Sequence, residues 1–237
     1  MGCLVSTIRI GGIEKFNIVD FPNRMSAVVF MQGCPWRCPF CHNTQLQDVN
    51  AETNIVWHKF VDFLKQRKGI LDAVVFSGGE PLVQAGLVDA VREVKALGYE
   101  IGLHTGGYLP QRFAEVLPLV DWVGFDIKAP FEAERYKELT GGAADLDKVL
   151  ESLRLLTDSG KRFECRTTCD PRFLSVEDIY KMGDSLKNMG VKEYYLQKYR
   201  KIPNDLVSNE AQALALVEDE KLLAYLGQIF EVFEVRV

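Results

Sequence analysis

The stretch Gln32–Asn43, with the sequence QGCPWRCPFCHN, carries three of the six cysteines in the spacing C-x3-C-x2-C, directly after an apolar run at 27–31. A disulfide framework does not suit this spacing, because one thiol would lack a partner and short loops strain the bond. Structural zinc sites use four protein ligands, and no second Cys/His pair of that kind follows downstream. A four-iron cluster is usually held by four thiolates. Three local thiolates would leave one iron open to another ligand, which is the hypothesis that the rest of the chain must support.

The composition is that of an ordinary globular protein. Its 237 residues are 47% hydrophobic and 26% charged, as in typical soluble domains. The net charge of −5 lacks the basic footprint of a nucleic-acid-binding protein. Neither an apolar run of about 18 residues nor a signal peptide is recognisable, so we expect no membrane partner and a reducing cytoplasm for the clustered cysteines. The start MGCLVS at 1–6 formally fits a myristoylation pattern, but an ordinary N-terminus explains it equally simply.

Short apolar runs alternate with helical patterns along the chain. The apolar runs lie at 26–32, 73–77, 100–104, 121–127, 163–168 and 193–197, and the helical patterns at 57–68, 84–97, 110–118, 147–158, 175–189 and 210–226. Strands that are apolar throughout and alternate with helices predict a parallel sheet covered by helices. Six such units fall short of the eight that close a full barrel, so we expect an α/β fold with a partial, TIM-like (β/α)6 barrel. A doubly wound open sheet is the alternative, although no G-x-G-x-x-G or Walker A sequence occurs.

The two ends of the chain frame this alternation. Residues 1–25 predict an N-terminal extension with a hairpin or edge strand, and the alternating segment 229–237 predicts a last edge strand. No internal repeat, low-complexity tract or convincing linker interrupts the chain. We therefore expect a single domain over 1–237, with the partial barrel at 26–200 and a C-terminal helix and strand at 201–237.

Polar residues gather where the predicted strands end. Chemistry in parallel α/β folds is found at the carboxyl ends of the strands. In chain order, the six strand ends carry the three cysteines, Ser77-Gly78-Gly79-Glu80-Pro81, His104-Thr105-Gly106-Gly107-Tyr108, Asp126 with Lys128, Arg166-Thr167-Thr168, and Gln197-Lys198. Six polar or glycine-rich ends on one face predict a site there.

Several of these residues have both a functional and a structural interpretation. Gly78 and Gly79 would let the backbone approach a small ligand closely, and Glu80 could hold an ammonium group. A plain turn with a capping carboxylate fits the same residues. Asp126 and Lys128 lie two positions apart and so point to the same side of a strand. A charged pair inside a barrel favours function, because burying charge is costly unless it is paired.

Other candidates carry weaker signals. Arg166 could clamp a carboxylate or serve a buried ion pair. Cys165 and Cys169 are too few to bind a second cluster, and free cysteine is among the most buried residue types, so we expect structural roles. His42 could be a fourth ligand of a zinc ion, but it adjoins Cys41 in sequence, and adjacent residues rarely reach one tetrahedral ion together.

The cysteine motif, Phe40 before its last cysteine, and the sequence GGEP at 78–81 resemble the radical S-adenosylmethionine (radical SAM) superfamily. The resemblance extends from about residue 8 to residue 200. It implies a 4Fe-4S cluster whose open iron is chelated by the amino and carboxylate groups of S-adenosylmethionine. It also implies reductive cleavage of the sulfonium to a 5′-deoxyadenosyl radical, which abstracts a hydrogen atom. The cofactor carries the hard chemistry, while the protein positions it and excludes water.

The resemblance assigns expected roles to individual residues. The cluster ligands would be Cys34, Cys38 and Cys41. The residues around S-adenosylmethionine would be Phe40 at the adenine, Ser77, Gly78, Gly79 and Glu80 at the methionine amino group, Thr105, Asp126 and Lys128 near the ribose and methionine parts, and Arg166 at the methionine carboxylate. One position departs from related formate-lyase activases, which have an Asp that helps bind a monovalent cation where this chain has His104. Such ions prefer oxygen ligands, so we leave a cation out of the expected site.

Within the superfamily, the chain is similar to the activating proteins of anaerobic ribonucleoside-triphosphate reductases, on the segments at 12–22, 28–43, 126–130 and 163–168. Such a protein abstracts the Cα hydrogen of a glycine on a partner glycyl radical enzyme and receives electrons from a donor such as flavodoxin or ferredoxin. The open side of a partial barrel could admit a loop of that large partner. A radical SAM enzyme with a small-molecule substrate is the alternative. A non-enzymatic iron–sulfur or zinc module is disfavoured, because it would not need the polar strand ends.

Overall fold

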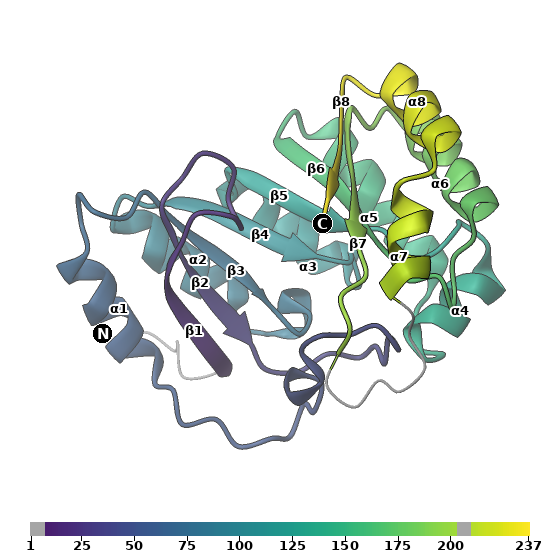
Figure 1. Ribbon diagram of the computed structural model, residues 1–237. Coiled ribbons are helices and arrows are strands. Elements are labelled where there is room, and N and C mark those ends of the chain that lie inside the picture. The colour runs from purple at the N-terminus through teal and green to yellow at the C-terminus, as the bar shows by residue number, and fades with distance from the viewer. Residues whose placement is uncertain (1–7, 203–209) are drawn as a thin grey trace. The chain divides into compact units, whose positions relative to one another are not determined.

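The computed structural model describes residues 8–202 and 210–237, so the myristoylation pattern at 1–6 lies outside the described residues. The eight strands of the described chain follow one another in chain order, from β1 to β8 (Figure 1). They are β1 Ile10–Asn17, β2 Ser26–Met31, β3 Ala73–Gly78, β4 Glu100–Thr105, β5 Trp122–Asp126, β6 Arg162–Cys169, β7 Glu193–Lys198 and β8 Val232–Arg236. β1 pairs antiparallel with β2, whereas β2–β3, β3–β4, β6–β7 and β7–β8 pair in parallel. The predicted α/β class and both predicted edge strands are confirmed.

The helices follow the predicted alternation closely. They are α1 Trp57–Gln66, α2 Leu87–Ala96, α3 Pro110–Val116, α4 Ala133–Thr140, α5 Leu146–Asp158, α6 Val176–Asn188, α7 Glu210–Val217 and α8 Glu220–Ile229. The prediction was wrong on two points. It missed α4, and it merged α7 with α8, which are separate because Asp219 caps α8 by accepting a hydrogen bond from the Leu222 N–H at 2.8 Å. None of the described helices is both long and apolar enough to cross a membrane.

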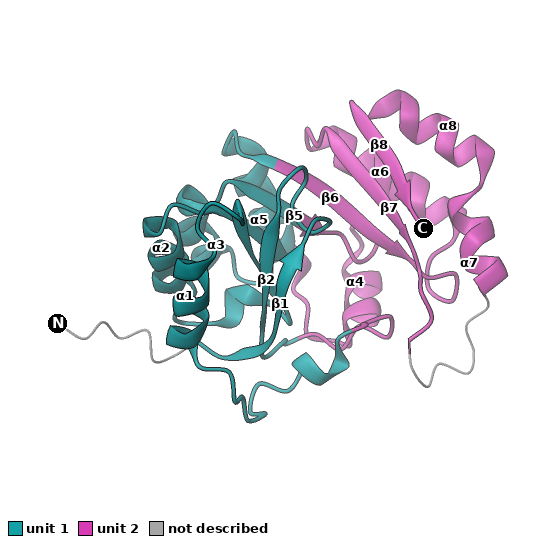
Figure 2. Cartoon of the chain, turned by 60° about the vertical axis from the view of Figure 1, so that its left-hand side comes forward, with its two compact units in different colours: residues 1–35, 43–124, 148–162 teal, residues 36–42, 125–147, 163–237 magenta. Residues whose placement is uncertain are grey.

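The chain divides into two compact units, which are described separately (Figure 2). Unit 1 contains the residues up to Pro35 together with 43–124 and 148–162, and unit 2 contains 36–42, 125–147 and the residues from Phe163 onward. The expectation of one domain over 1–237 stays a prediction.

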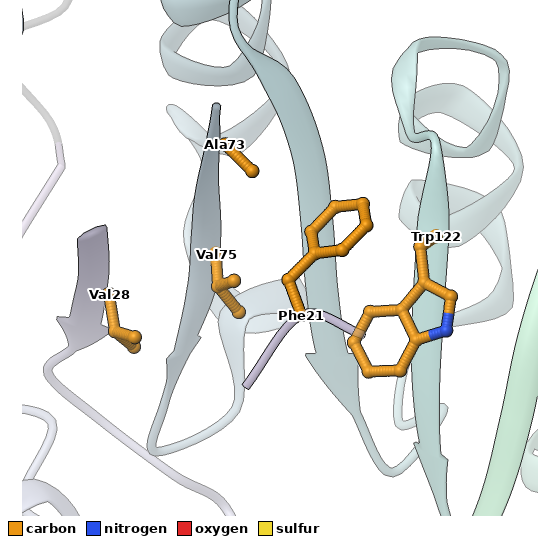
Figure 3. Close-up of a cluster of buried hydrophobic side chains, with 5 residues drawn as sticks. All are labelled: Phe21, Val28, Ala73, Val75 and Trp122. Carbon is orange, nitrogen blue, oxygen red and sulfur yellow. The ribbon is translucent and has the colours of Figure 1, made fainter. Parts of the chain in front are cut away.

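The core of unit 1 holds the loop between β1 and β2 in place. Phe21 of this loop is fully buried, and its ring centroid lies 5.4 Å from that of Trp122 in β5. The cluster around it consists of Phe21, Val28, Ala73, Val75 and Trp122 (Figure 3). The burial of two aromatic rings anchors a loop that would otherwise be free to move.

Unit 2 is held together by a buried ion pair across its strands. Glu164 of β6 is fully buried, and the Arg236 guanidinium of β8 binds both of its carboxylate oxygens, at 2.5 and 2.8 Å. The same guanidinium lies 3.9 Å from the ring centroid of Tyr195 in β7, the strand between them. The bidentate geometry is the strong form of such a pair. It therefore fixes the register of β8 through side chains as well as through the backbone.

Candidate active site

The cysteine loop leaves the end of β2 on a tightly held backbone. Gly33 has φ +102°, a conformation that glycine adopts without the strain that a side chain would add. Its N–H donates to the Leu46 carbonyl at 2.7 Å, and the N–H of Cys34 donates to the Gln47 carbonyl at 3.1 Å. Cys34 is half-buried and forms no disulfide. The first of the three thiols therefore stands on backbone that unit 1 fixes.

The other two thiols of the loop belong to unit 2. Cys38 is buried, Cys41 is half-buried, and the N–H of Cys41 donates to the Cys38 carbonyl at 3.1 Å. The N–H of Arg37 donates to the Thr140 carbonyl at the end of α4, at 2.8 Å. Burial raises the pKa of the Cys38 thiol to about 11, against the opposing effect of the nearby Lys128. The unpredicted helix α4 thus supports this part of the loop.

The donor set of the loop fits an iron–sulfur cluster. Cys34, Cys38 and Cys41 form no disulfides, and thiolates are the ligands that hold such clusters. Within residues 8–202 and 210–237, however, no three His, Cys, Asp or Glu side chains already form a metal-binding group. The chemistry of the ligands therefore fits, and their convergence on a cluster belongs to the proposal below.

The turn after β3 packs against the cysteine loop. The N–H of Gly79 donates to the Met31 carbonyl at 2.9 Å, and the N–H of Glu80 donates to the Gly33 carbonyl at 3.0 Å. A Cβ on Gly78 would lie 2.3 Å from the Met31 nitrogen, and a Cβ on Gly79 would lie 2.2 Å from the Gly33 oxygen. The space left by the missing side chains of Gly78 and Gly79 is therefore occupied by the protein's own backbone. The turn thereby sets the start of the loop that carries Cys34.

Glu80 links the turn after β3 to the end of β4. Its side chain is 2% exposed. Its Oε1 accepts hydrogen bonds from the Leu82 N–H at 3.0 Å and the Thr105 hydroxyl at 2.6 Å, and its Oε2 accepts from the Gly106 N–H at 2.9 Å. Thr105 Oγ1 in turn accepts from the Gly107 N–H at 3.0 Å. Two of the predicted site residues, Glu80 and Thr105, are therefore in direct contact, and neutral donors surround the carboxylate.

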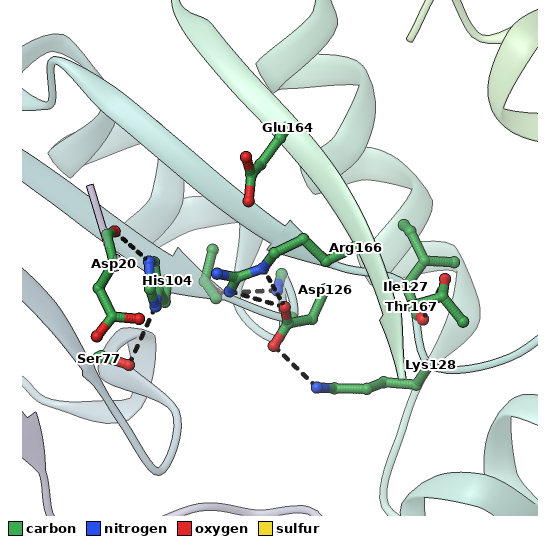
Figure 4. Close-up of polar contacts among 12 residues, drawn as sticks. Asp20, Ser77, His104, Asp126, Ile127, Lys128, Glu164, Arg166 and Thr167 are labelled. Carbon is green, nitrogen blue, oxygen red and sulfur yellow. Dashed lines mark hydrogen bonds and ion pairs between the residues drawn. The ribbon is translucent and has the colours of Figure 1, made fainter. Parts of the chain in front are cut away.

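His104, at the end of β4, contacts the predicted site residue Ser77. Its Nδ1 lies 3.3 Å from the Ser77 hydroxyl and its Nε2 lies 2.9 Å from the Asp20 carbonyl oxygen (Figure 4). The imidazole is 8% exposed and meets the Trp122 ring edge-on, with the centroids 5.5 Å apart. The sequence marked His104 only as a departure from a family pattern, because its partners come from distant segments.

The predicted pair of Asp126 and Lys128 is confirmed, and Arg166 joins it. Asp126 Oδ2 lies 2.9 Å from Lys128 Nζ, while its Oδ1 lies 2.9 Å from Arg166 Nε and 2.8 Å from Arg166 Nη2 (Figure 4). The backbone N–H of Lys128 donates to the Tyr136 hydroxyl at 3.2 Å. Burial alone would lower the pKa of Lys128, but Asp126 and then Cys38 raise it above its ordinary value. One carboxylate is therefore shared by two cations, and Tyr136 is a supporting residue that the sequence reasoning missed.

The remaining candidates are buried. Phe40 is 4% exposed. Cys165 and Cys169 are fully buried and free, as their predicted structural roles require. Burial raises the pKa of Cys169 to about 12 and raises that of Cys165 well above its ordinary range. Neither thiol is therefore available as a thiolate near neutral pH.

Comparisons with known proteins place the chain in a family. Residues 28–169 match the radical SAM superfamily. A protein of Methanocaldococcus jannaschii named as a glycyl-radical enzyme activating enzyme is 30% identical, over 90% of this chain and 88% of that protein. The pyruvate formate-lyase-activating enzyme of Clostridium pasteurianum is also 30% identical, over 94% of this chain and 98% of its own length.

Solved structures share the fold. SuiB of Streptococcus suis, solved with bound S-adenosylmethionine, aligns with a TM-score of 0.69 at 16% identity, over 87% of this chain. The chain spans 48% of the length of SuiB. QueE of Escherichia coli aligns with a TM-score of 0.58 at 14% identity, over 97% of this chain and 94% of its own. The predicted partial-barrel fold is thereby confirmed.

Enzymes of this superfamily use a 4Fe-4S cluster and S-adenosylmethionine, which agrees with the cysteine-rich loop and with the expected cofactors. The match covers more than half of the described chain, including all three loop cysteines and the turn after β3. Together with the two activating enzymes that align over nearly the full chain, it shows that this protein belongs to the radical SAM superfamily, in the group of the glycyl-radical enzyme activating enzymes.

Proposed function

We propose that this enzyme cleaves S-adenosylmethionine reductively at a cluster held by Cys34, Cys38 and Cys41, and that it takes the Cα hydrogen from a glycine of a partner anaerobic ribonucleotide reductase. The observation that carries the proposal is the set of three cysteines on one loop, none of them in a disulfide. The bound cluster and S-adenosylmethionine supply electron transfer and the 5′-deoxyadenosyl radical. The protein's part is to bind, orient and shield them.

In unit 1, the turn after β3 supplies oxygen acceptors for the amino group of S-adenosylmethionine. Ser77 lies near the end of β3 and Glu80 on the turn that follows it, and the N–H groups of Gly79 and Glu80 already donate to the Met31 and Gly33 carbonyls. The buried Glu80 carboxylate is fixed in place by its three hydrogen bonds to protein. A fixed acceptor does not have to reorganise when a cation binds, which strengthens recognition.

In unit 2, the cluster of Asp126, Lys128 and Arg166 supplies positive charge. Lys128 and Arg166 both pair with the Asp126 carboxylate. Arg166 and Lys128 would hold the methionine carboxylate, and the Lys128 ammonium near Cys38 would favour its thiolate, the form that binds iron. The backbone at Phe40 would meet the adenine.

The partner is proposed from the similarity of the segments at 12–22, 28–43, 126–130 and 163–168 to reductase activating proteins. The relatives found above include pyruvate formate-lyase-activating enzymes, so a formate lyase is the competing partner. A small-molecule substrate is the second candidate function. We further propose a reducing cytoplasm as the working compartment, because the five cysteines in the described part of the chain form no disulfide. We also propose flavodoxin or ferredoxin as the electron donor.

The mechanism is tested with protein reconstituted anaerobically with iron and sulfide. We expect about four irons per chain and release of 5′-deoxyadenosine from S-adenosylmethionine when a reductant is added. Cys38→Ala should abolish the cleavage, while Cys165→Ala, which removes a buried thiol outside the loop, should retain it. Cleavage by the Cys38→Ala protein would refute the mechanism.

The partner is tested by electron paramagnetic resonance after the active enzyme is mixed with either an anaerobic ribonucleotide reductase or a pyruvate formate-lyase from the same cell. A glycyl doublet with the reductase supports the proposal. A doublet with the formate lyase alone reassigns the partner. Cofactor cleavage without a doublet in either mixture favours a small-molecule substrate.

A further inference from the structure

The contact between His104 and Asp20 determines which nitrogen of the imidazole carries a proton. The Asp20 carbonyl oxygen, 2.9 Å from Nε2, can only accept a hydrogen bond. Nε2 must therefore carry the hydrogen, and in the neutral ring Nδ1 is then an acceptor. The only way to satisfy the 3.3 Å contact between Nδ1 and Ser77 is for the serine hydroxyl to donate to the ring.

The Asp20 carbonyl is itself held in place by its neighbours. Asn17 Oδ1 accepts from the backbone N–H groups of Val19 and Asp20, both at 2.7 Å. Its Nδ2 donates to the Asp20 carboxylate at 2.8 Å. This side-chain-to-backbone turn, together with the buried Phe21 that follows it, fixes the acceptor of His104. The imidazole is thus locked in one tautomer and one orientation by unit 1 alone.

This arrangement determines what Ser77 can offer a ligand. Its only hydrogen is committed to His104, so the oxygen presents lone pairs alone. The N–H groups of Gly79 and Glu80 on the same turn are also committed, to carbonyls of the cysteine loop. The turn after β3 therefore presents acceptors, which suits a ligand group with hydrogens and no lone pair, such as an ammonium group.

We propose that His104 is a positioning residue that makes the Ser77 hydroxyl an obligate acceptor for the amino group of S-adenosylmethionine. The inference rests on the proposed function, because it concerns the same cofactor. His104 acts through Ser77 and selects the protonated amine over ligands that lack it.

The test compares two ligands on the reconstituted holoenzyme: S-adenosylhomocysteine and its analogue without the amino group, measured by isothermal titration calorimetry. His104→Phe keeps an aromatic ring against Trp122 but removes the acceptor for Ser77. We expect this variant to bind S-adenosylhomocysteine about tenfold more weakly. Its affinity for the analogue should change by no more than about twofold. Ser77→Ala should have the same selective effect, and the double variant should add nothing further, because both changes break one interaction.

A rescue variant separates positioning from packing. His104→Asn places an oxygen where Nδ1 stood, so it should recover most of the affinity for S-adenosylhomocysteine. An equal loss for both ligands in His104→Phe, or additive effects of the two single variants, would overturn the inference and leave the proposed function standing. If the unaltered holoenzyme releases no 5′-deoxyadenosine from S-adenosylmethionine, the proposed function fails, and this inference fails with it.

Discussion

Glu80 in unit 1 and Asp126 in unit 2 are carboxylates at strand ends, yet they are stabilised in opposite ways. Glu80 accepts hydrogen bonds from two backbone N–H groups and one hydroxyl, all of them neutral. Asp126 is bound by the cations of Lys128 and Arg166. Neutral donors stabilise a carboxylate and leave its negative charge in place, whereas two cations more than cancel that negative charge. One region therefore suits a positive ligand group, and the other suits a negative one.

Among single substitutions at neutral pH, the largest effect is expected where a carboxylate balances two cations. Asp126→Asn leaves Lys128 and Arg166 without their shared anion, so the free energy of unfolding should fall by about 3 kcal/mol, measured by chemical denaturation. Asp62→Asn, which breaks an exposed pair with Lys65, is the control and should leave the midpoint unchanged. If the two variants behaved alike, the ionic interpretation of the Asp126 cluster would be wrong.

A smaller effect is expected in the neutral region. Glu80→Gln keeps the shape but places an amide N–H₂ group against a donor, the Gly106 N–H or the Thr105 hydroxyl. One buried polar contact is then lost, which should lower the free energy of unfolding by about 2 kcal/mol. Glu52→Gln, at an exposed position, is the matched control. A loss as large as that of Asp126→Asn would contradict the difference drawn between the two regions.

Alkaline pH should lower the stability of unit 2, because this unit contains two buried thiols. The pKa of Cys169 is raised from 9.0 to about 12 and that of Cys165 is also raised, in both cases by burial. The folded protein therefore keeps these protons at a pH where the unfolded chain loses them. Stability should be unaffected below about pH 8.5 and should fall above pH 9, by about 1.4 kcal/mol per pH unit for each thiol.

The measurement is the free energy of unfolding of the reduced apoprotein between pH 8 and pH 11. The double variant Cys165→Ala/Cys169→Ala should show a shallower decline than the parent protein. Parallel curves for the two proteins would show that other groups cause the alkaline loss.

The smallest effect concerns the hydroxyl that supports Lys128. Tyr136→Phe removes the acceptor of the Lys128 backbone N–H. The free energy of unfolding, measured by thermal or chemical denaturation, should fall by about 1 kcal/mol. Tyr180→Phe is the control, since Tyr180 is half-buried and no hydrogen bond reaches its hydroxyl among the described residues. If Tyr136→Phe were as stable as the control, Tyr136 would have no supporting role.

The strands were predictable because buried parallel strands are apolar on both faces. The predicted runs at 73–77 and 193–197 differ from β3 and β7 by a single residue at one end. Helix α4 was missed because its eight residues, AERYKELT, are largely polar and give little apolar periodicity. The break between α7 and α8 depends on a cap at Asp219 inside an otherwise helical pattern.

The site was predictable as a set of residue types at strand ends, and less so as a set of contacts. The Asp126–Lys128 pair was predicted from a spacing of two on a strand, although β5 ends at Asp126 and Lys128 lies just beyond it. Glu80 caps the nearby Leu82 N–H, as the alternative of a capping carboxylate predicted. Its other partners, and those of His104, come from other strands and loops, and no local pattern encodes them. The same holds for Gly78 and Gly79, whose missing side chains make room for the backbone of Met31 and Gly33.

The contact between the turn after β3 and the cysteine loop has a consequence for the maturation of the enzyme. The segment Gly33–Cys34 receives a hydrogen bond from Glu80, which lies far downstream in sequence, and β2 pairs in parallel with β3 across a crossover connection that contains α1. The cysteine loop therefore cannot take its final shape until β3 and the turn after it are in place. We expect iron and sulfide to be delivered to a chain that has already completed β3, so that cluster insertion follows folding.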